Sequence, residues 1–249
     1  MKWSLSIAFS LLMSIAFGQV NQVDAQGRKQ GAWEKVHPGT RVYMYRGEFK
    51  DDKPIGKFTY FYKSSKMKAL LIHNEDGRSE GYYYHATGGL MSYGIYRDLM
   101  KDSIWVNWDK NGKLSSKESF KLDSLDGIKV VYYVPKDGDR SQRPSSVSRY
   151  KEGKLHGDYQ EYFDSGKMKV RGKYEDGKKI GEWDSFHPGG KKMNLIRYKD
   201  GKKHGWCYGY DEKGKETGKK YYYYGHLLEG KQLKEKMRQM KELGIHPNE

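Results

Sequence analysis

The chain has 249 residues, and 47 Lys and Arg against 32 Asp and Glu give it a formal net charge of +15. Only 36% of the residues are hydrophobic, and low hydrophobicity with high net charge is typical of disordered chains. The 22 Tyr, 8 Phe and 6 Trp argue against disorder, because disordered segments contain few aromatic residues. The single cysteine, Cys207, excludes an intrachain disulfide framework and a cysteine-based zinc site.

The N-terminus carries the one long apolar run. Lys2 supplies a positive charge, an apolar segment runs from Leu5 to Phe17, and Ala16 and Gly18 form a small-x-small cleavage signal. This pattern predicts a secretory signal peptide, residues 1–18, cut after Gly18, although a buried N-terminal helix or strand is the alternative. The run is too short to span a bilayer. We therefore expect an exported protein, periplasmic or associated with the cell envelope, with no transmembrane segment after cleavage.

A repeated unit organises residues 25–224. Segments such as EGKLHGDY, DGKKIGEW and DGKKHGWC align on one glycine, and consecutive units lie 22 to 30 residues apart. The eight register positions are Gly31, Gly56, Gly81, Ser103, Gly127, Gly157, Gly181 and Gly205. Each unit contains two short candidate strands and two turns, which is the size of a β-hairpin.

Aromatic residues recur at fixed positions relative to this register. Seven positions before it stand Phe49, Asn74, Tyr96, Phe120, Tyr150, Tyr174 and Tyr198. Two positions after it stand Trp33, Phe58, Tyr83, Trp105, Lys129, Tyr159, Trp183 and Cys207, and five after it Val36, Phe61, Ala86, Trp108, Tyr132, Tyr162, Phe186 and Tyr210. Rings in neighbouring strands stack as ladders, so we expect these columns to form a core rather than a ligand platform. The last two columns have opposite parity and lie on opposite faces unless a bulge intervenes.

Turn chemistry separates the strands. Pairs such as Asp176-Gly177 and Asp200-Gly201 predict hairpin turns, because glycine accepts a positive φ without steric cost. The register glycine falls within or beside the following strand, where the missing Cβ would let a ring approach closely. On this interpretation, Gly181→Val overpacks the ring ladder.

The segment from Tyr174 to Trp183, which reads Tyr-x-Asp-Gly-Lys-x-x-Gly-x-Trp, resembles the MORN repeat. With the second Gly-Lys turn that follows, the unit is closest to the variant repeat of YwqK-type bacterial proteins, which carry an antitoxin label. The resemblance implies an all-β fold: an elongated, twisted antiparallel β-meander of about eight two-strand repeats. It implies protein-binding and sometimes membrane-associated scaffolds, and no chemistry.

Both the C-terminus and one internal segment break the repeat. Residues 225–249 follow the repeat domain, residues 19–224, and the spacing of Leu233, Met237 and Met240 predicts a helix over 232–243. We expect this helix to cap the last strand, and a helix offered to a partner is the alternative. The irregular segment 135–148 is either a longer surface hairpin tip or a partner-binding loop. The candidate contact residues in that loop are Lys136, Arg140 and Arg143.

No catalytic, cofactor or metal site is expected. The repeat accounts for most of the 8 histidines, since His156 and His204 share a column and His37 and His187 share a His-Pro-Gly turn. His73, His85 and His246 show no metal-ligand spacing and are interpreted as lone exposed side chains. Neither a nucleophile elbow nor a phosphate loop is present in the sequence. Cys207 replaces an aromatic residue in its column, which indicates a buried core thiol.

Basic residues form two further columns, one expected along each edge of the meander. The candidate anionic-surface contacts are Arg28, Lys53, Arg78, Lys154, Lys178 and Lys202. The second row comprises Arg41, Lys66, Lys113, Lys167, Lys191 and Lys215. Such rows either solvate the turns and guard against aggregation, or attract anionic lipid, acidic polysaccharide or an acidic protein face. Export makes nucleic acid an unsuitable partner.

The sequence thus predicts an exported, non-enzymatic scaffold for protein–protein interaction in the cell envelope, such as an accessory subunit of an envelope complex. A binder of glycan or an anionic membrane surface is the first alternative, and an antitoxin or immunity-like protein is the second. The partner's identity, the binding face and the oligomeric state are left open by the sequence.

Overall fold

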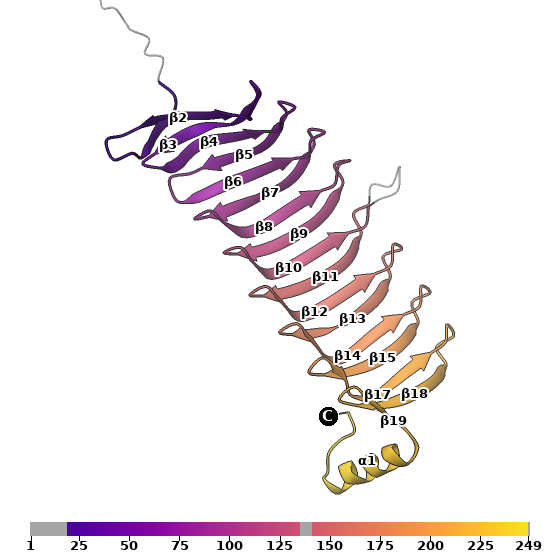
Figure 1. The fold of residues 1–249 in the computed structure, drawn as a ribbon. Coiled ribbons are helices and arrows are strands. Elements are labelled where there is room, and N and C mark those ends of the chain that lie inside the picture. The colour runs from indigo at the N-terminus through magenta and orange to yellow at the C-terminus, as the bar shows by residue number, and fades with distance from the viewer. Residues whose placement is uncertain (1–18, 135–140, 249) are drawn as a thin grey trace, which may run out of the picture.

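The computed structural model describes residues 19–134 and 141–248, so the predicted signal peptide lies outside the described part. Within it, 19 strands form one long open sheet, and a single helix follows at the C-terminal end (Figure 1). Consecutive strands pair antiparallel, with β16 and β17 both pairing with β15, which confirms the predicted twisted β-meander. No helix among the described residues is long and apolar enough to cross a membrane.

The strands follow one another with short turns. Their bounds are β1 Gln22–Val23, β2 Lys29–Val36, β3 Tyr43–Lys50, β4 Lys53–Phe61, β5 Met67–His73, β6 Arg78–Tyr84, β7 Leu90–Arg97, β8 Met100–Trp108, β9 Leu114–Lys121, β10 Ser124–Tyr132, β11 Pro144–Lys151, β12 Lys154–Tyr162, β13 Met168–Glu175, β14 Lys178–Phe186, β15 Lys192–Lys199, β16 Lys202–Lys203, β17 Gly205–Tyr210, β18 Glu216–Tyr223 and β19 His226–Leu228. The helix α1 spans Gly230–Glu242. Apart from the short end strands β1 and β19, they form the predicted two-strand units, with β16 and β17 as one strand interrupted at His204.

Successive turns alternate between two edges of the sheet (Figure 1). One edge, which we call the Asp-Gly edge, carries the predicted hairpin turns, and Asp176 and Gly177 there have φ values of 45° and 81°. Two consecutive positive φ values define the turn type whose twist matches the strands. Neighbouring turns also bond to each other, since the N–H of Gly177 donates to the carbonyl of Leu155 at 2.8 Å and that of Gly201 to Lys179 at 3.0 Å. Equivalent bonds link each turn of this edge to the next from 75–78 to 199–202.

The other edge, the lysine edge, carries the turns that precede Arg41, Lys66, Lys113, Lys167, Lys191 and Lys215. Side chains at the start of five turns each reach the backbone carbonyl of the next unit. These contacts are His37 Nε2 to Phe61 O (3.0 Å), Tyr62 OH to Tyr84 O (2.7 Å), His85 Nε2 to Trp108 O (3.0 Å), Tyr133 OH to Tyr162 O (2.8 Å) and His187 Nε2 to Tyr210 O (2.9 Å). A carbonyl only accepts, so Nε2 carries the proton in the three histidines. His85 is therefore not a lone histidine but a third member of the set.

Most register residues have a role different from the one predicted. Gly181 has φ +63°, and a Cβ added there would meet nothing within 4 Å, so it serves a bulge and not a close approach. The glycine beneath a ring stands nine positions earlier: a Cβ on Gly172 would overlap the ring of Trp183. Gly47 under Phe58 and Gly94 under Trp105 repeat this arrangement. The expectation for Gly181 was wrong because a positive φ and a ring packed on the backbone both require glycine, and the sequence does not distinguish the two requirements.

Gly81 is the register position where a ring does approach closely. A Cβ there would lie 2.9 Å from the ring of Tyr96, and the residue has no positive φ. The pairing of β5 with β6 runs without a register shift, and β6 has 7 residues where β4 has 9. The missing residues explain why the next register position, Ser103, follows after a shorter interval.

The rings two positions after the register form the core, as predicted. Phe58, Trp105 and Trp183 are only 3%, 2% and 4% exposed. Each packs edge-on against a tyrosine or phenylalanine of the preceding strand, with ring centroids 5.0 Å apart for Tyr174 and Trp183. We call this side of the sheet the ladder face and the other side the reverse face.

Residues five positions after the register lie on the reverse face. Tyr162 donates its hydroxyl proton to Gln160 at 2.6 Å, and the guanidinium of Arg171 lies 5.6 Å from the ring of Phe186. Gln160 has the opposite parity to Tyr159 of the ladder. The two aromatic columns therefore occupy opposite faces, which answers the question of parity.

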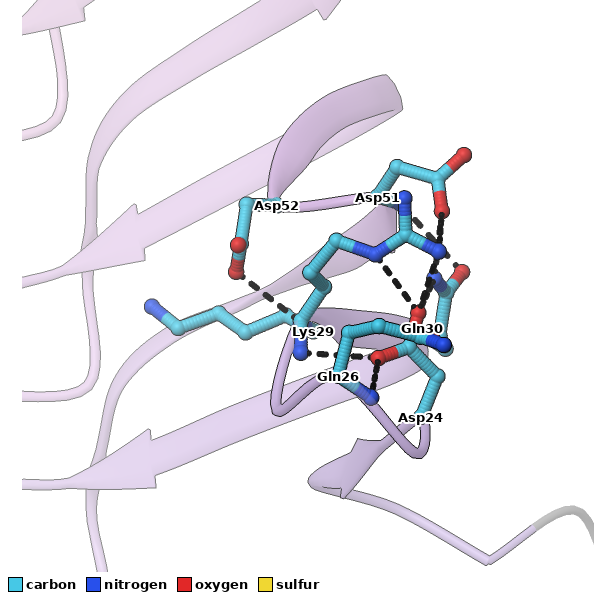
Figure 2. Close-up of polar contacts among 7 residues, drawn as sticks. Asp24, Gln26, Lys29, Gln30, Asp51 and Asp52 are labelled. Carbon is cyan, nitrogen blue, oxygen red and sulfur yellow. Dashed lines mark hydrogen bonds and ion pairs between the residues drawn. The ribbon is translucent and has the colours of Figure 1, made fainter.

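The N-terminal end is closed by β1 and by a turn built around Asp24 (Figure 2). The Oδ1 atom of Asp24 accepts the backbone N–H groups of Gln26 and Arg28, both at 2.9 Å, and Oδ2 accepts from Arg28 Nε at 2.8 Å. Partial desolvation alone would raise the pKa of Asp24, but these hydrogen bonds, with one from Gln30, lower it to about 2. Arg28 also pairs with Asp51 of the next turn at 3.1 Å, so the first unit is tied to the second.

The C-terminal end is closed by α1, which begins and ends close to the predicted positions and packs on the reverse face. Tyr221 is 1% exposed, and its hydroxyl lies 3.3 Å from the sulfur of Met240 and 3.1 Å from the carbonyl oxygen of Pro247. The ammonium group of Lys236 lies 3.7 Å from the ring centroid of Tyr223. These contacts confirm the capping helix.

Candidate functional site

The predicted partner loop is shorter than expected. β11 begins at Pro144, so residues 144–148 are strand: they pair with β10, and residues 146–148 also pair with β12. Lys136 and Arg140 lie outside the described residues. Arg143 is described, and its guanidinium lies 3.8 Å from the carboxylate of Asp164 in a neighbouring turn.

The first predicted basic row follows the Asp-Gly edge, where acidic residues accompany it. Arg28 pairs with Asp24 at 2.7 Å, and Arg78 pairs with Asp76 at 2.7 Å. In the turns of this edge basic and acidic residues are equally frequent; these turns are 50–53, 75–78, 97–100, 121–124, 151–154, 175–178 and 199–202. The edge therefore alternates in sign and offers no continuous cationic row.

The second row follows the lysine edge, where basic residues outnumber acidic ones. The described turns are 37–41, 62–66, 85–89, 109–113, 163–167, 187–191 and 211–215. Two lysines also link neighbouring turns, since Lys66 Nζ donates to Thr87 O at 3.4 Å and Lys167 Nζ to Gly189 O at 3.5 Å. The excess positive charge of the described sheet edges is thus concentrated on the lysine edge.

On the reverse face, the residues change from charged to uncharged and back along the length of the sheet. One residue of each long strand lies directly opposite the next, which gives an unbroken row of cross-strand pairs. This reverse row is Glu34, Arg46, Thr59, Leu70, Tyr82, Tyr93, Val106, Lys117, Val130, Val147, Gln160, Arg171, Asp184, Leu195, Tyr208 and Lys219. It begins with charged residues, is uncharged from Thr59 to Gln160 except for Lys117, and becomes charged again at Arg171.

Four isoleucines stand two positions away on the same strands and widen the uncharged stretch. Charged residues interrupt this second row, since Glu80 lies opposite both Ile72 and Ile95, Asp102 lies opposite Ile95, and Arg149 lies opposite Ile128. We call this surface the apolar centre; it comprises Leu70, Ile72, Tyr82, Tyr93, Ile95, Ile104, Val106, Ile128, Val130 and Val147. Ile104 is 56% exposed and Ile128 is 40% exposed, and the others are half-buried. Near the C-terminal end of the same face, by contrast, Tyr221 is covered by α1. The apolar centre thus lacks a cover among the described residues.

The Asp-Gly edge changes beside the apolar centre. Leu99 and Leu122 occupy turn positions with φ values of 64° and 49°, and they are 67% and 48% exposed. A positive φ costs a side chain such as leucine roughly 1–2 kcal/mol. Met100 and Ser124 stand where other units have Lys or Arg. Two strained, exposed leucines therefore stand at this edge, at the ends of strands that carry the apolar centre.

Charged side chains flank the apolar centre on both sides. Toward the N-terminus, Glu34 and Arg46 lie 3.4 Å apart beside a shallow hollow of about 330 Å³. Toward the C-terminus, the carboxylate of Asp184 is 7% exposed and lies between Arg171 at 2.8 Å and Lys192 at 2.6 Å. Each flank therefore presents both positive and negative groups.

The reverse row also has a pattern in the sequence, but it is less conspicuous than the aromatic columns. Outside the short unit of Gly81, the reverse row falls three positions after and ten positions before the register, and these columns turn from charged to β-branched and aromatic in the middle units. In the Gly81 unit the row falls on Leu70 and Tyr82, eleven positions before and one position after the register. Among the described residues, no group of three or more His, Cys, Asp or Glu could hold a metal ion.

Comparison with known proteins assigns no family or function, so a functional assignment depends on the geometry. No family model matches the chain, and no curated protein matches it significantly.

Proposed function

We propose that this protein is an exported, non-enzymatic β-repeat scaffold that binds a protein in the cell envelope through its apolar centre. The apolar centre with charged flanks carries the proposal, because protein interfaces have a core depleted of charge and a polar rim. Soluble monomers seldom leave contiguous apolar patches exposed. Membership of the MORN-repeat group and export through residues 1–18 belong to the same proposal.

The ladder face is less suited to bind a partner, which favours a protein over a glycan. Sugars stack on exposed ring faces, but Trp105 and Trp183 are buried. Lysines also lie over them, with Lys101 Nζ 4.4 Å from the ring centroid of Trp105 and Lys179 Nζ 4.0 Å from that of Trp183. Aliphatic side chains such as Ile104 gain free energy when another protein surface covers them, about 25 cal/mol per Å².

Site-specific photo-crosslinking in the protein's own host tests this proposal. p-Benzoylphenylalanine replaces Ile104 or Ile128 in the centre and, as the control, Leu243, which is 72% exposed beyond α1. We expect protein adducts, identified by mass spectrometry, from positions 104 and 128 and none from 243. Absence of adducts from both central positions, with normal expression, contradicts the proposal.

The lysine edge favours a second candidate function, contact with an anionic membrane or polysaccharide. Lysines on alternate strands are about 9.6 Å apart, close to the Debye length in physiological salt, so their attraction is weak and salt-dependent. The test is co-sedimentation with anionic vesicles or an acidic polysaccharide. Replacing Lys66, Lys167 and Lys191 by Gln should abolish retention, while replacing Lys53, Lys178 and Lys202 removes the same charge and should preserve it. Equal loss in both variants, or retention insensitive to salt, contradicts this candidate.

A further inference from the structure

We propose that the apolar centre is covered by the same surface of a second copy of this chain, sheet on sheet about a two-fold axis. This inference rests on the proposed function, because it names the protein that covers the centre.

The packing of the two faces of the sheet favours a second sheet as the layer that covers the apolar centre. An antiparallel sheet usually has at least one face packed against a second layer. Here the ladder face is filled by its own rings and lysines, and α1 covers only the last strands of the reverse face (Figure 1). Two twisted sheets pack face to face with their strands within about 30° of each other. A second copy supplies a sheet of matching twist and matching apolar extent.

The size of the centre predicts a weak, reversible dimer. Seven strands, β5 to β11, span about 30 Å at about 4.8 Å per strand, and the two rows of side chains extend about 15 Å along the strands. Two copies would then bury about 900 Å² in total, close to the lower limit of about 1,000 Å² for specific interfaces. Leu99 and Leu122 add to this area at the edge. The dimer should therefore form and dissociate with concentration.

The distribution of charge fits a two-fold axis parallel to the strands between β7 and β8, close to the middle of the uncharged stretch. Such an axis exchanges β2 with β13 and β6 with β9. Glu34 then faces Arg171 of the second copy, and Lys117, the one charge inside the reverse row's uncharged stretch, faces the ring of Tyr82 of the second copy. A cation over an aromatic face is attractive. A self-complementary surface of this kind is what a two-fold interface requires.

Sedimentation equilibrium of the purified protein tests the inference. We expect the apparent mass to rise with concentration from that of the monomer toward twice that value. Ile104→Lys and Ile128→Lys should each raise the dissociation constant by about tenfold or more, because each buries a charge in the interface. Lys117→Glu should raise it as well. Leu243→Lys is the matched control and should leave it unchanged, and unchanged melting temperatures show that the variants fold.

The outcomes separate this inference from the proposed function. A monomer at every concentration, or a dimer that Ile104→Lys leaves intact, overturns the second-copy inference. If the photo-crosslinker at position 104 then captures a different protein, the scaffold function stands. If it captures neither a second copy nor another protein, both proposals fail.

Discussion

Lys129 and Glu118 form an ion pair at 3.0 Å across β10 and β9, at the position where other units have a ring above a glycine. In the unit of β14, for example, the ring is Trp183 and the glycine is Gly172. In this unit lysine replaces the ring and glutamate replaces the glycine. The two replacements occur together because a lysine above a glycine would have no side chain to pair with. The ladder face is therefore continuous, with a polar link between two aromatic blocks.

This pairing predicts strong coupling between the two positions. Glu118→Gly leaves the half-buried ammonium of Lys129 without its partner, and Lys129→Trp places a ring on the Glu118 side chain. Each change should lower the free energy of unfolding by about 1–2 kcal/mol. The double variant restores the ring–glycine arrangement and should be at least as stable as the native protein. A double-mutant cycle by urea denaturation measures this, and additive losses contradict the coupling.

The two kinds of glycine predict different responses to alanine. Gly172→Ala places a Cβ inside the ring of Trp183 and should cost about 3 kcal/mol through overpacking. Gly181→Ala meets open space, and its positive φ should cost about 1 kcal/mol. Chemical denaturation of both variants gives the comparison, and a larger loss for Gly181→Ala would refute the assignment of roles.

Leu99 predicts opposite effects on stability and on binding. Leu99→Gly relieves a positive φ in a position where other units have glycine, so the free energy of unfolding should rise by about 1 kcal/mol. The same change removes exposed apolar surface beside the centre, so crosslinking from position 104 and dimer formation should both weaken. Thermal melting and sedimentation measure the two effects. Loss of stability together with unchanged association would show that the leucine serves the turn alone.

His204 predicts a loss of stability in mild acid. Its side chain is 2% exposed, Nδ1 accepts the N–H of Tyr224 at 3.3 Å, and Nε2 has no partner among the described residues. Burial first, and then the charges of Lys199 and Lys236, lower the pKa of His204 below its ordinary value of 6.5. As the pH falls, the unfolded chain therefore binds a proton at His204 before the folded chain does. The contribution of His204 to the free energy of unfolding is full above pH 6.5 and falls as the pH drops below it.

The measurement is the free energy of unfolding at pH 7 and pH 5 for the native protein and for His204→Gln. The glutamine can still accept the N–H of Tyr224, but it does not titrate. The difference between the two pH values should be smaller in the variant. His73 has a pKa lowered by burial as well, so part of the pH dependence should persist. An identical pH dependence in both proteins contradicts the role of His204.

The fold could be predicted because its turns depend on neighbouring residues in the sequence. The binding surface and the roles of the glycines could not, because they depend on the register between strands. Asp176 and Gly177 predict their turn because the requirement for positive φ lies within the pair itself. The roles of Gly172 and Gly181 could not be assigned, because only the cross-strand register shows which glycine lies beneath Trp183. Val106 and Val147 seemed ordinary strand residues, since their membership of one surface depends on the pairing of four consecutive strands. His85 was interpreted as a lone histidine because its shorter unit places it four positions after the register, where His37 and His187 stand six after it.

The unshifted pairing of β5 with β6 at Gly81 has a mechanical consequence. Each bulge adds to the local right-handed twist of its strands, so the sheet coils less where the bulge is missing. The register shifts return between β7 and β8 and between β9 and β10, so the lower twist is confined to the β5–β6 pair at the edge of the apolar centre. Flat surfaces approach each other over a larger area than coiled ones, so we expect a second layer to lie most closely against this short unit.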